Sequence, residues 1–364
     1  MNKKPRLHFI DALRAFAILM MLQGHFVDTF LSFESRDTSS MVYNIWLYCR
    51  GFTAPVFFTV TGFVFTYLLL RHPIQGKKNP RLRKGFFRGL ELLVWGYALR
   101  LNIWGLFLGQ IYPNFYITDV LHIIGVSLIV LVSLYWLGAG IPKALLGAIL
   151  VSLTFVIFLS EPFYRTIEFT SLPTMIGSYL TQVNGGVFYI FPWLGYVTIG
   201  SFLALLMNHS TKSSFPKWSF WLSFSGVALI CLSSTFIDLF LSNFPDLVHP
   251  MILKNPYLFH RLGDTFLLFA LFMLLENRFR EGYFLEIGQR TLSVYIIHYI
   301  LLYGGLLGYG LKRIIDPNGL SGWTSALGAI SFMAIVVLLV LGYYHSDKIQ
   351  QFQTNLKQGK IKKS

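Results

Sequence analysis

The sequence is poor in cysteine and in charged residues. Only two of its 364 residues are cysteines, and 13% of the chain is charged, against about 25% in soluble domains. Two cysteines cannot hold a chain of this length together, so a secreted disulfide scaffold is excluded. Hydrophobic residues make up 54% of the chain, and this composition also excludes an intrinsically disordered protein.

Acidic residues are scarce as well. The chain has 16 of them against 30 lysine and arginine residues, which gives a net charge of +14. A nucleic-acid-binding protein would gather this charge along one solvated face, whereas here it lies in short segments between long apolar runs. About 20 apolar residues in a helix cross a hydrocarbon core of about 30 Å. The sequence therefore predicts an all-α polytopic membrane protein whose partner is the lipid bilayer and not nucleic acid.

Ten apolar runs predict ten transmembrane helices. They cover approximately residues 9–31, 42–70, 89–107, 117–137, 144–160, 187–207, 218–242, 257–277, 292–311 and 323–344. The second run is too long for one span, so its start is expected to lie along the membrane interface before Pro55 bends the chain inward. Pro192 is expected to kink the start of the sixth span. Without a repeat or a soluble domain, the chain is predicted to form one transmembrane domain over 1–345 and a basic tail over 346–364.

The lysine and arginine residues predict the orientation, because positively charged loops stay in the cytoplasm. With the N-terminus inside, the inner segments hold 21 of these residues and the outer segments hold five. Ten spans then place the C-terminus in the cytoplasm too. Asp11 and Arg14 interrupt the first apolar run, so we expect a retained span rather than a cleaved signal peptide. These two residues can also pair, since they lie three apart on one helix face.

Titratable side chains recur at the predicted outer ends of several spans. A rise of 1.5 Å per residue puts His25 about 24 Å along the first span. The residues at this level are His25, Asp28, Arg50, Arg100, Asp119, His122, His260, Arg261 and Asp264. Such groups are costly at membrane depth unless they face a cavity or a partner, which favours an outer polar chamber. The alternative for each pair is a snorkelling side chain or a structural ion pair. No metal-ligand spacing is present, so no metal site is predicted.

The predicted cytoplasmic loop after the second span is basic. It contains Arg81, Arg83, Lys84 and Arg88 and no acidic residue. Guanidinium groups bind phosphate oxygens in pairs, so a ligand with several phosphates fits this cluster. The alternative is topogenic charge that contacts anionic lipid.

Further polar and aromatic residues lie deeper in the predicted spans. Trp193, Tyr295 and His298 are expected either to pack between helices or to line a polar path.

Several segments resemble a known family. In RLHFIDALRAFAILMMLQGHF, ten residues separate Arg14 from His25. This opening, together with APVFFTVTGF, TDVLHIIGVSLI, FPWLGYVTIG and IGQRTLSVYIIH, resembles the transmembrane acyltransferases. These comprise the acyltransferase-3 family and the related heparan-α-glucosaminide N-acetyltransferase-like membrane proteins. The resemblance extends over nearly all of the predicted spans in order.

The resemblance implies a transfer reaction. An acyl group, expected to be acetyl, would pass from cytoplasmic acyl-CoA to a hydroxyl or amine of an extracytoplasmic glycan or glycolipid, in a bacterial plasma membrane. By position, His25 would be the catalytic histidine and Arg14 its companion. The basic cluster would be the CoA-binding loop, although RLRK replaces the two arginines three apart that are often found there.

The chemistry of the residues agrees with this function. Imidazole can take a hydroxyl proton at neutral pH, an aspartate such as Asp28 or Asp119 could orient its ring, and an arginine could hold the developing oxyanion. One rival function is a transporter or flippase for a polar lipid-linked saccharide, but the sequence shows neither the inverted repeats nor the broken helices of many transporters. A receptor or scaffold would leave the outer charged residues unexplained.

Overall fold

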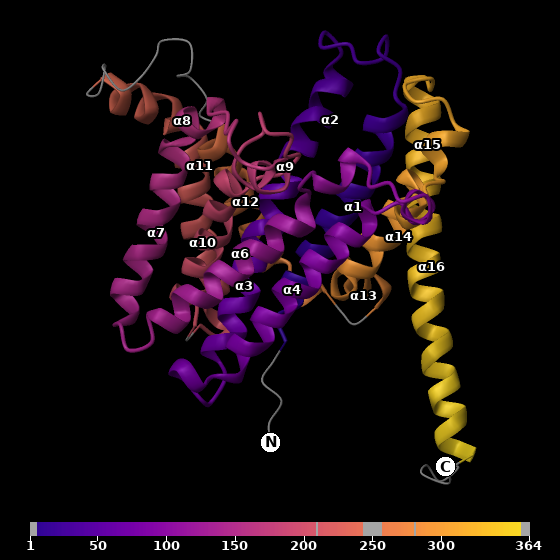
Figure 1. Cartoon of the computed structure of the whole chain (residues 1–364). Coiled ribbons are helices and arrows are strands. Elements are labelled where there is room, and N and C mark those ends of the chain that lie inside the picture. The colour runs from indigo at the N-terminus through magenta and orange to yellow at the C-terminus, as the bar shows by residue number, and fades with distance from the viewer. Residues whose placement is uncertain (1–5, 209, 243–256, 280–281, 358–364) are drawn as a thin grey trace. The chain divides into compact units, whose positions relative to one another are not determined.

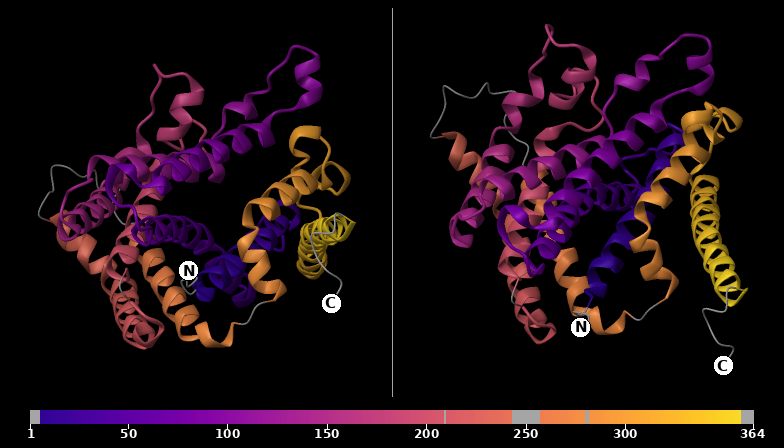
Figure 2. Two further views of the ribbon diagram at one scale, coloured as in Figure 1. Left: turned by 90° about the horizontal axis from the view of Figure 1, so that it is seen from below. Right: turned by 60° about the horizontal axis from the view of Figure 1, so that its bottom comes forward.

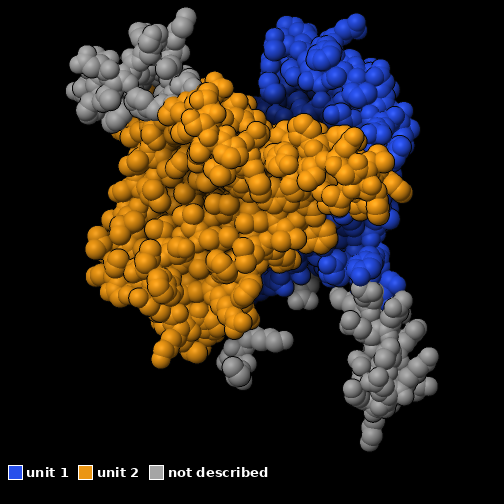
Figure 3. Space-filling model, viewed as in Figure 1, with its two compact units in different colours: residues 1–50, 276–364 blue, residues 51–275 orange. Residues whose placement is uncertain are grey.

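The computed structural model describes residues 6–208, 210–242, 257–279 and 282–357. Within these residues the chain forms helices and no β-sheet, apart from one isolated bridge between Leu31 and Leu320. The predicted all-α fold is confirmed. The helices fall into two compact units (Figure 3), one formed by Met1–Arg50 with Glu276–Ser364 and the other by Gly51–Leu275.

The first unit combines the two ends of the chain. Its helices are α1 (His8–Phe30), α2 (Met41–Gly51, which ends at the unit boundary), α13 (Tyr283–Gln289), α14 (Thr291–Tyr303), α15 (Leu311–Ile314) and α16 (Gly322–Lys357). Helix α1 packs against α13, α14 and α16, as Figure 1 shows. Phe9, Leu13 and Leu22 on α1 are fully buried. The predicted basic tail begins as a continuation of α16, and residues 358–364 lie outside the described part of the chain.

The second unit contains the middle of the chain. Its helices are α3 (Thr53–Leu70), α4 (Pro80–Arg100), α5 (Ile103–Phe107), α6 (Val120–Leu137), α7 (Lys143–Leu159), α8 (Glu161–Thr166), α9 (Thr174–Leu180), α10 (Ile190–Leu206), α11 (Phe215–Ser242) and α12 (Tyr257–Leu274). Helix α10 packs against α3, α6 and α7, while α4 packs against α6 and α12 against α11.

Glycine permits the close approach of α3 and α10. A Cβ atom added at Gly62 would overlap the carbonyl oxygen of Val197, and one added at Gly200 would overlap that of Thr59. Helices in a membrane gain from such close packing, because lipid supplies little hydrophobic drive between them. Gly200 belongs to the segment FPWLGYVTIG, which therefore serves helix packing in this unit.

The predicted kink at Pro192 is confirmed. Phe191 has non-helical dihedral angles of −95° and 127° inside α10. Trp193 follows the kink and stacks on the ring of Phe58 at a centroid distance of 5.1 Å. Trp193 therefore contacts α3 through Phe58, and its predicted role stays open between helix packing and lining a polar path.

Most of the predicted spans correspond to apolar helices. Among the described residues, six helices are long and apolar enough to cross a membrane, or seven if α13 and α14 count as one bent span. The predicted fifth and sixth spans are the shorter apolar helices α7 and α10. The limits predicted for the third span are wrong, because α4 begins at Pro80 and ends at Arg100, and Asn102 then caps the separate helix α5. The total of ten spans and the cytoplasmic termini stay predictions.

The helix pair α13 and α14 is bent by 82°, a feature that can be followed in Figure 2. Arg290 lies at the bend with dihedral angles of −115° and 25°. Gly288, just before it, lies so close to the carbonyl oxygen of Asp11 that a Cβ atom would not fit. The expectation that the chain has no broken helix is wrong. The break lies where α13 and α14 pack against α1, and no proline marks it in the sequence.

Candidate active site

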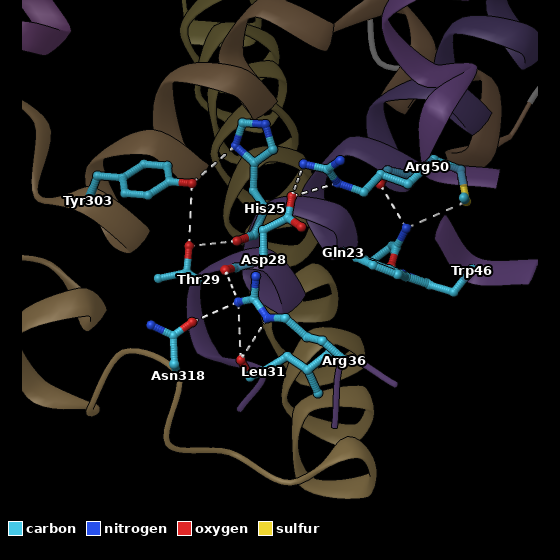
Figure 4. Close-up of polar contacts among 11 residues, drawn as sticks. Gln23, His25, Asp28, Thr29, Leu31, Arg36, Trp46, Arg50, Tyr303 and Asn318 are labelled. Atoms are coloured by element: carbon cyan, nitrogen blue, oxygen red, sulfur yellow. Dashed lines mark hydrogen bonds and ion pairs between the residues drawn. The ribbon is translucent and has the colours of Figure 1, made fainter. Parts of the chain in front are cut away.

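His25 lies near the C-terminal end of α1 and is half-buried. Its Nδ1 atom is 3.5 Å from the hydroxyl of Tyr303 on α14. The hydroxyl of Thr29 lies 3.4 Å from the same tyrosine oxygen and donates to the backbone oxygen of His25 at 2.7 Å. Figure 4 shows Tyr303 and Thr29 on one side of the histidine. The structure thus gives the His25 ring a neighbour that the sequence analysis did not select.

His298 of α14 is the second histidine of this cluster. Its ring centroid is 5.3 Å from that of His25, with an interplanar angle of 69°. Tyr295 lies 4.8 Å from His298 on the same helix. His298 is fully buried and Tyr295 is 5% exposed. Both residues were predicted to pack or to line a polar path, and the structure places His298 beside His25 and Tyr295 beside His298. Tyrosines at positions 295, 299 and 303 share a helix face, which is the signal that could have indicated Tyr303.

Asp28 lies one turn beyond His25 on α1, and its carboxylate faces α2. Arg50 Nε donates to Asp28 Oδ2 at 2.6 Å, and Nη2 of the same arginine contacts the same oxygen. Figure 4 shows the contact between Arg50 and Asp28. Next to this pair, the indole of Trp46 donates to Gln23 at 2.7 Å. The carboxylate predicted to orient His25 is therefore occupied by an arginine.

Arg14 and Asp11 lie toward the other end of α1, and each has a partner other than the predicted one. Arg14 Nη2 donates to the hydroxyl of Thr291 at 2.8 Å, at the first residue of α14. Asp11 is buried and accepts from Arg6 Nε at 2.7 Å. Arg14 therefore connects α1 to the bend between α13 and α14, about 16 Å along the helix from His25.

In the second unit, Arg100, Asp119 and His122 come together at the start of α6. Arg100 Nη2 donates to Asp119 Oδ2 at 2.9 Å, and these side chains are only 10% and 14% exposed. Asp119 caps α6, while its own backbone N–H donates to His122 Nδ1 at 3.1 Å. This reciprocal capping box fixes the start of the helix.

Two tyrosines complete the surroundings of His122, which is fully buried. The ring of Tyr97 on α4 lies edge-on at a centroid distance of 4.4 Å, and its hydroxyl is 2.9 Å from that of Tyr179 on α9. Gly96 leaves room for the imidazole, since a Cβ atom there would contact the ring at 2.7 Å. The sequence analysis selected neither tyrosine, because their separation along the chain hides their proximity.

Three predicted residues lie together at the start of α12. Arg261 Nη1 donates to Asp264 Oδ2 at 3.0 Å, and both residues are buried. The guanidinium group also lies over the ring of Tyr257 at 5.1 Å. His260, in the same turn, is half-buried. For Arg261 and Asp264, the structural ion pair that the sequence analysis considered is present.

The predicted basic loop is wrong in its secondary structure, because its arginines lie on the first turns of α4. Asn79 caps this helix by accepting from the backbone N–H of Arg81, and Pro80 occupies the first turn. The cluster Arg81, Arg83, Lys84 and Arg88 follows. The first turn has no acidic residue, and Arg88 pairs with Glu91 at 2.8 Å. The start of α4 is therefore strongly cationic.

A comparison with known protein families identifies the family to which the chain belongs. The family model for the catalytic region of heparan-alpha-glucosaminide N-acetyltransferase matches residues 6–242. The chain belongs to this family. No curated protein matches the chain. Membership of the heparan-alpha-glucosaminide N-acetyltransferase family makes the chain a membrane acetyltransferase, and it confirms the resemblance found in the sequence.

The matched region, residues 6–242, contains some of the candidate site residues and leaves others outside it. Arg14, His25, the cationic start of α4 and the Arg100–Asp119–His122 cluster lie within the matched residues of this acetyltransferase family. His298 and Tyr303 lie beyond them, although α14 places both against His25. Among the described residues, no group of three or more His, Cys, Asp or Glu side chains is arranged to hold a metal ion.

Proposed function

We propose that the chain transfers an acetyl group from cytoplasmic acetyl-CoA to a hydroxyl or amine of an extracytoplasmic glycan or glycolipid, in a bacterial plasma membrane. The observation that carries this proposal is His25 within an acetyltransferase family. It is a half-buried imidazole whose Nδ1 faces the hydroxyl of Tyr303. With a proton held on Nδ1 toward that hydroxyl, Nε2 is the nitrogen that acts as the base.

His25 performs the proton transfer in this reaction. Its Nε2 accepts the proton of the acceptor hydroxyl as the oxygen attacks the carbonyl carbon of the thioester. The new C–O bond forms, the C–S bond breaks, and His25 returns the proton to the departing thiolate. Imidazole suits both steps, since it gains and loses a proton near neutral pH. Donor and acceptor leave as free thiol and acetyl ester, so the ring ends in the state in which it began.

The cationic start of α4 fits the phosphates of the donor. The helix has 21 residues, and its positive dipole end coincides with Arg81, Arg83 and Lys84. Cations at a helix N-terminus repel the dipole and one another, whereas an anion there is stabilised by both. Arg83 and Lys84 are exposed and available to solvent-borne phosphate groups. We propose that this cluster binds the phosphates of CoA.

The remaining charged residues of the predicted outer level are proposed to contact the acceptor. They are Arg50, Arg100, Asp119, His122, His260, Arg261 and Asp264. This proposal is supported by the position of these polar groups at helix ends. Together they offer both hydrogen-bond donors and acceptors, as sugar recognition requires. The ion pairs among these residues also stabilise the fold. Neutral substitutions, measured for both stability and acceptor use, separate the contribution to folding from the contribution to acceptor binding.

The test uses the full-length protein in sealed vesicles. Radiolabelled acetyl-CoA is supplied on the face that carries the tail, and a cell-envelope glycan fraction is supplied on the other. We expect label on the glycan with the wild-type protein and none with His25→Gln. Translocation of unlabelled lipid-linked saccharide, without transfer of acetyl groups, would instead establish the transporter function and overturn the proposal.

A further inference from the structure

His298 has no hydrogen-bond partner that explains its burial. The side chain is fully buried, and neither Nδ1 nor Nε2 makes a well-formed hydrogen bond to the described residues, although backbone groups of Val294 and Tyr295 on its own helix lie near the ring. Buried polar atoms are almost always satisfied, and those that are not tend to have a functional reason. The rings around His298 belong to His25, Tyr295 and Tyr299. An apolar side chain would pack in these surroundings without this cost, so packing alone does not account for a histidine.

The separation of the two histidines suits a direct bond between them. Two imidazole rings joined by an N–H···N bond of about 2.9 Å have centroids about 5 Å apart. The observed distance between His25 and His298 is 5.3 Å, with the rings tilted by 69°.

We propose that His298 is the positioning residue of His25, a role that rests on the proposed acetyl transfer. When Nε2 of His25 takes the acceptor proton, the Nδ1–H of the charged ring turns from the Tyr303 hydroxyl, 3.5 Å away, to the free nitrogen of His298. This bond holds the ring in place and stabilises the positive charge, as a carboxylate does in a serine hydrolase triad. The proton returns from His25 to the thiolate, so His298 keeps its own proton throughout and no further reactant is needed.

The other titratable groups around the pair support this assignment. Tyr295, Tyr299 and Tyr303 are the ones that α14 supplies. On α1, the carboxylate of Asp28 is bound by Arg50 of α2. The helices α13 and α16 contribute Glu286 and His345, which bond to each other at 3.2 Å. The carboxylates of Asp28 and Glu286 thus each have a partner of their own, and His298 is the group that accepts from the charged His25 ring in this proposal.

The test compares apolar and polar replacements of His298. His298→Phe fills the space but accepts no hydrogen bond, so we expect kcat to fall at least about tenfold. The KM for acetyl-CoA and the thermal midpoint should stay close to wild type. The acid limb of the kcat/KM profile should move to lower pH, because the charged form of His25 has lost its acceptor. His298→Gln restores a carbonyl oxygen and should recover most of the lost kcat. His298→Leu serves as the apolar variant if the phenylalanine variant does not fold.

His345→Gln is the matched control, because His345 belongs to the same unit and bonds to Glu286. It should leave kcat and the pH profile unchanged. Apolar variants of His298 with wild-type kcat and pH profile would overturn the proposal while leaving the acetyl transfer in place. Equal losses in the apolar and glutamine variants, accompanied by a lower thermal midpoint, would likewise show that His298 only packs. A wild-type protein without any transfer activity would overturn the proposed function and this role together.

Discussion

The histidine clusters of the two units are held by different hydrogen bonds and ion pairs. In the second unit, His122 is fixed through Nδ1 by a capping box with Asp119, whose carboxylate also pairs with Arg100, while Nε2 of His122 has no hydrogen-bond partner among the described residues. In the first unit, His25 Nδ1 makes a long contact of 3.5 Å to Tyr303, and the nitrogens of its neighbour His298 have no hydrogen-bond partner among the described residues.

This difference separates a structural network from a reactive one. A capping box and a buried ion pair stabilise a helix start without any ligand. A half-buried histidine beside an unsatisfied one costs stability, and such a cost is typical of functional sites. Substitutions in the first cluster are therefore expected to change turnover, while those in the second are expected to change stability first.

The largest effect is expected at His25. His25→Gln keeps a polar side chain but cannot accept a proton at neutral pH, so turnover should fall by about 10²- to 10⁴-fold. The thermal midpoint and acetyl-CoA binding should change little. Transfer of label from acetyl-CoA measures the first quantity, and ligand binding in detergent measures the second. A variant that retains more than about a tenth of wild-type turnover would show that His25 is not the base.

The next largest effect is a loss of stability at Asp119. Asp119→Ala removes the helix cap and leaves Arg100 buried without its carboxylate, which typically costs about 3–5 kcal/mol. Asp119→Asn preserves a capping oxygen and should cost less. Thermal unfolding in detergent measures both variants, and the activity of the folded fraction shows any role with the acceptor. An unchanged midpoint in Asp119→Ala, with acceptor use lost, would assign this cluster to the substrate instead.

A smaller effect is expected at the start of α4. Replacing Arg81 and Arg83 by glutamine removes two charges, and the KM for acetyl-CoA should rise roughly tenfold while its salt dependence weakens. The double variant Lys212→Gln and Lys217→Gln removes two charges from another predicted cytoplasmic segment and serves as the control. If both double variants bind acetyl-CoA equally well, the α4 cluster serves only to set the membrane topology.

The smallest effect is expected at Asp28. Its pair with Arg50 is partly exposed, at 31% and 44% for the two side chains, and exposed ion pairs contribute about 0–1 kcal/mol. Asp28→Asn should therefore lower turnover by less than about fivefold, as measured by transfer of label. A loss of more than about a hundredfold would mean that this carboxylate, rather than His298, stabilises the charged His25 ring.

The sequence by itself determined the class of the protein, most of its apolar helices and the family. Hydropathy is a local property, and a run of apolar residues has few alternatives to a buried or membrane-spanning helix. The spacing of Arg14 and His25 could also be read directly, because both lie on one continuous helix. The basic cluster was found by its composition, although its helical structure was missed because its charges interrupt the apolar pattern.

Only the tertiary structure decided which side chains surround the candidate base. Tyr303 and His298 are separated from His25 by more than 270 residues, and no periodicity within a single helix reports which helix packs beside it. The bend at Arg290 and the partner of Asp28 depend on the same information, since both arise where α1 meets other helices. Local sequence sets helix formation and polarity, whereas the neighbours of a catalytic group follow from helix packing, which is a property of the whole chain.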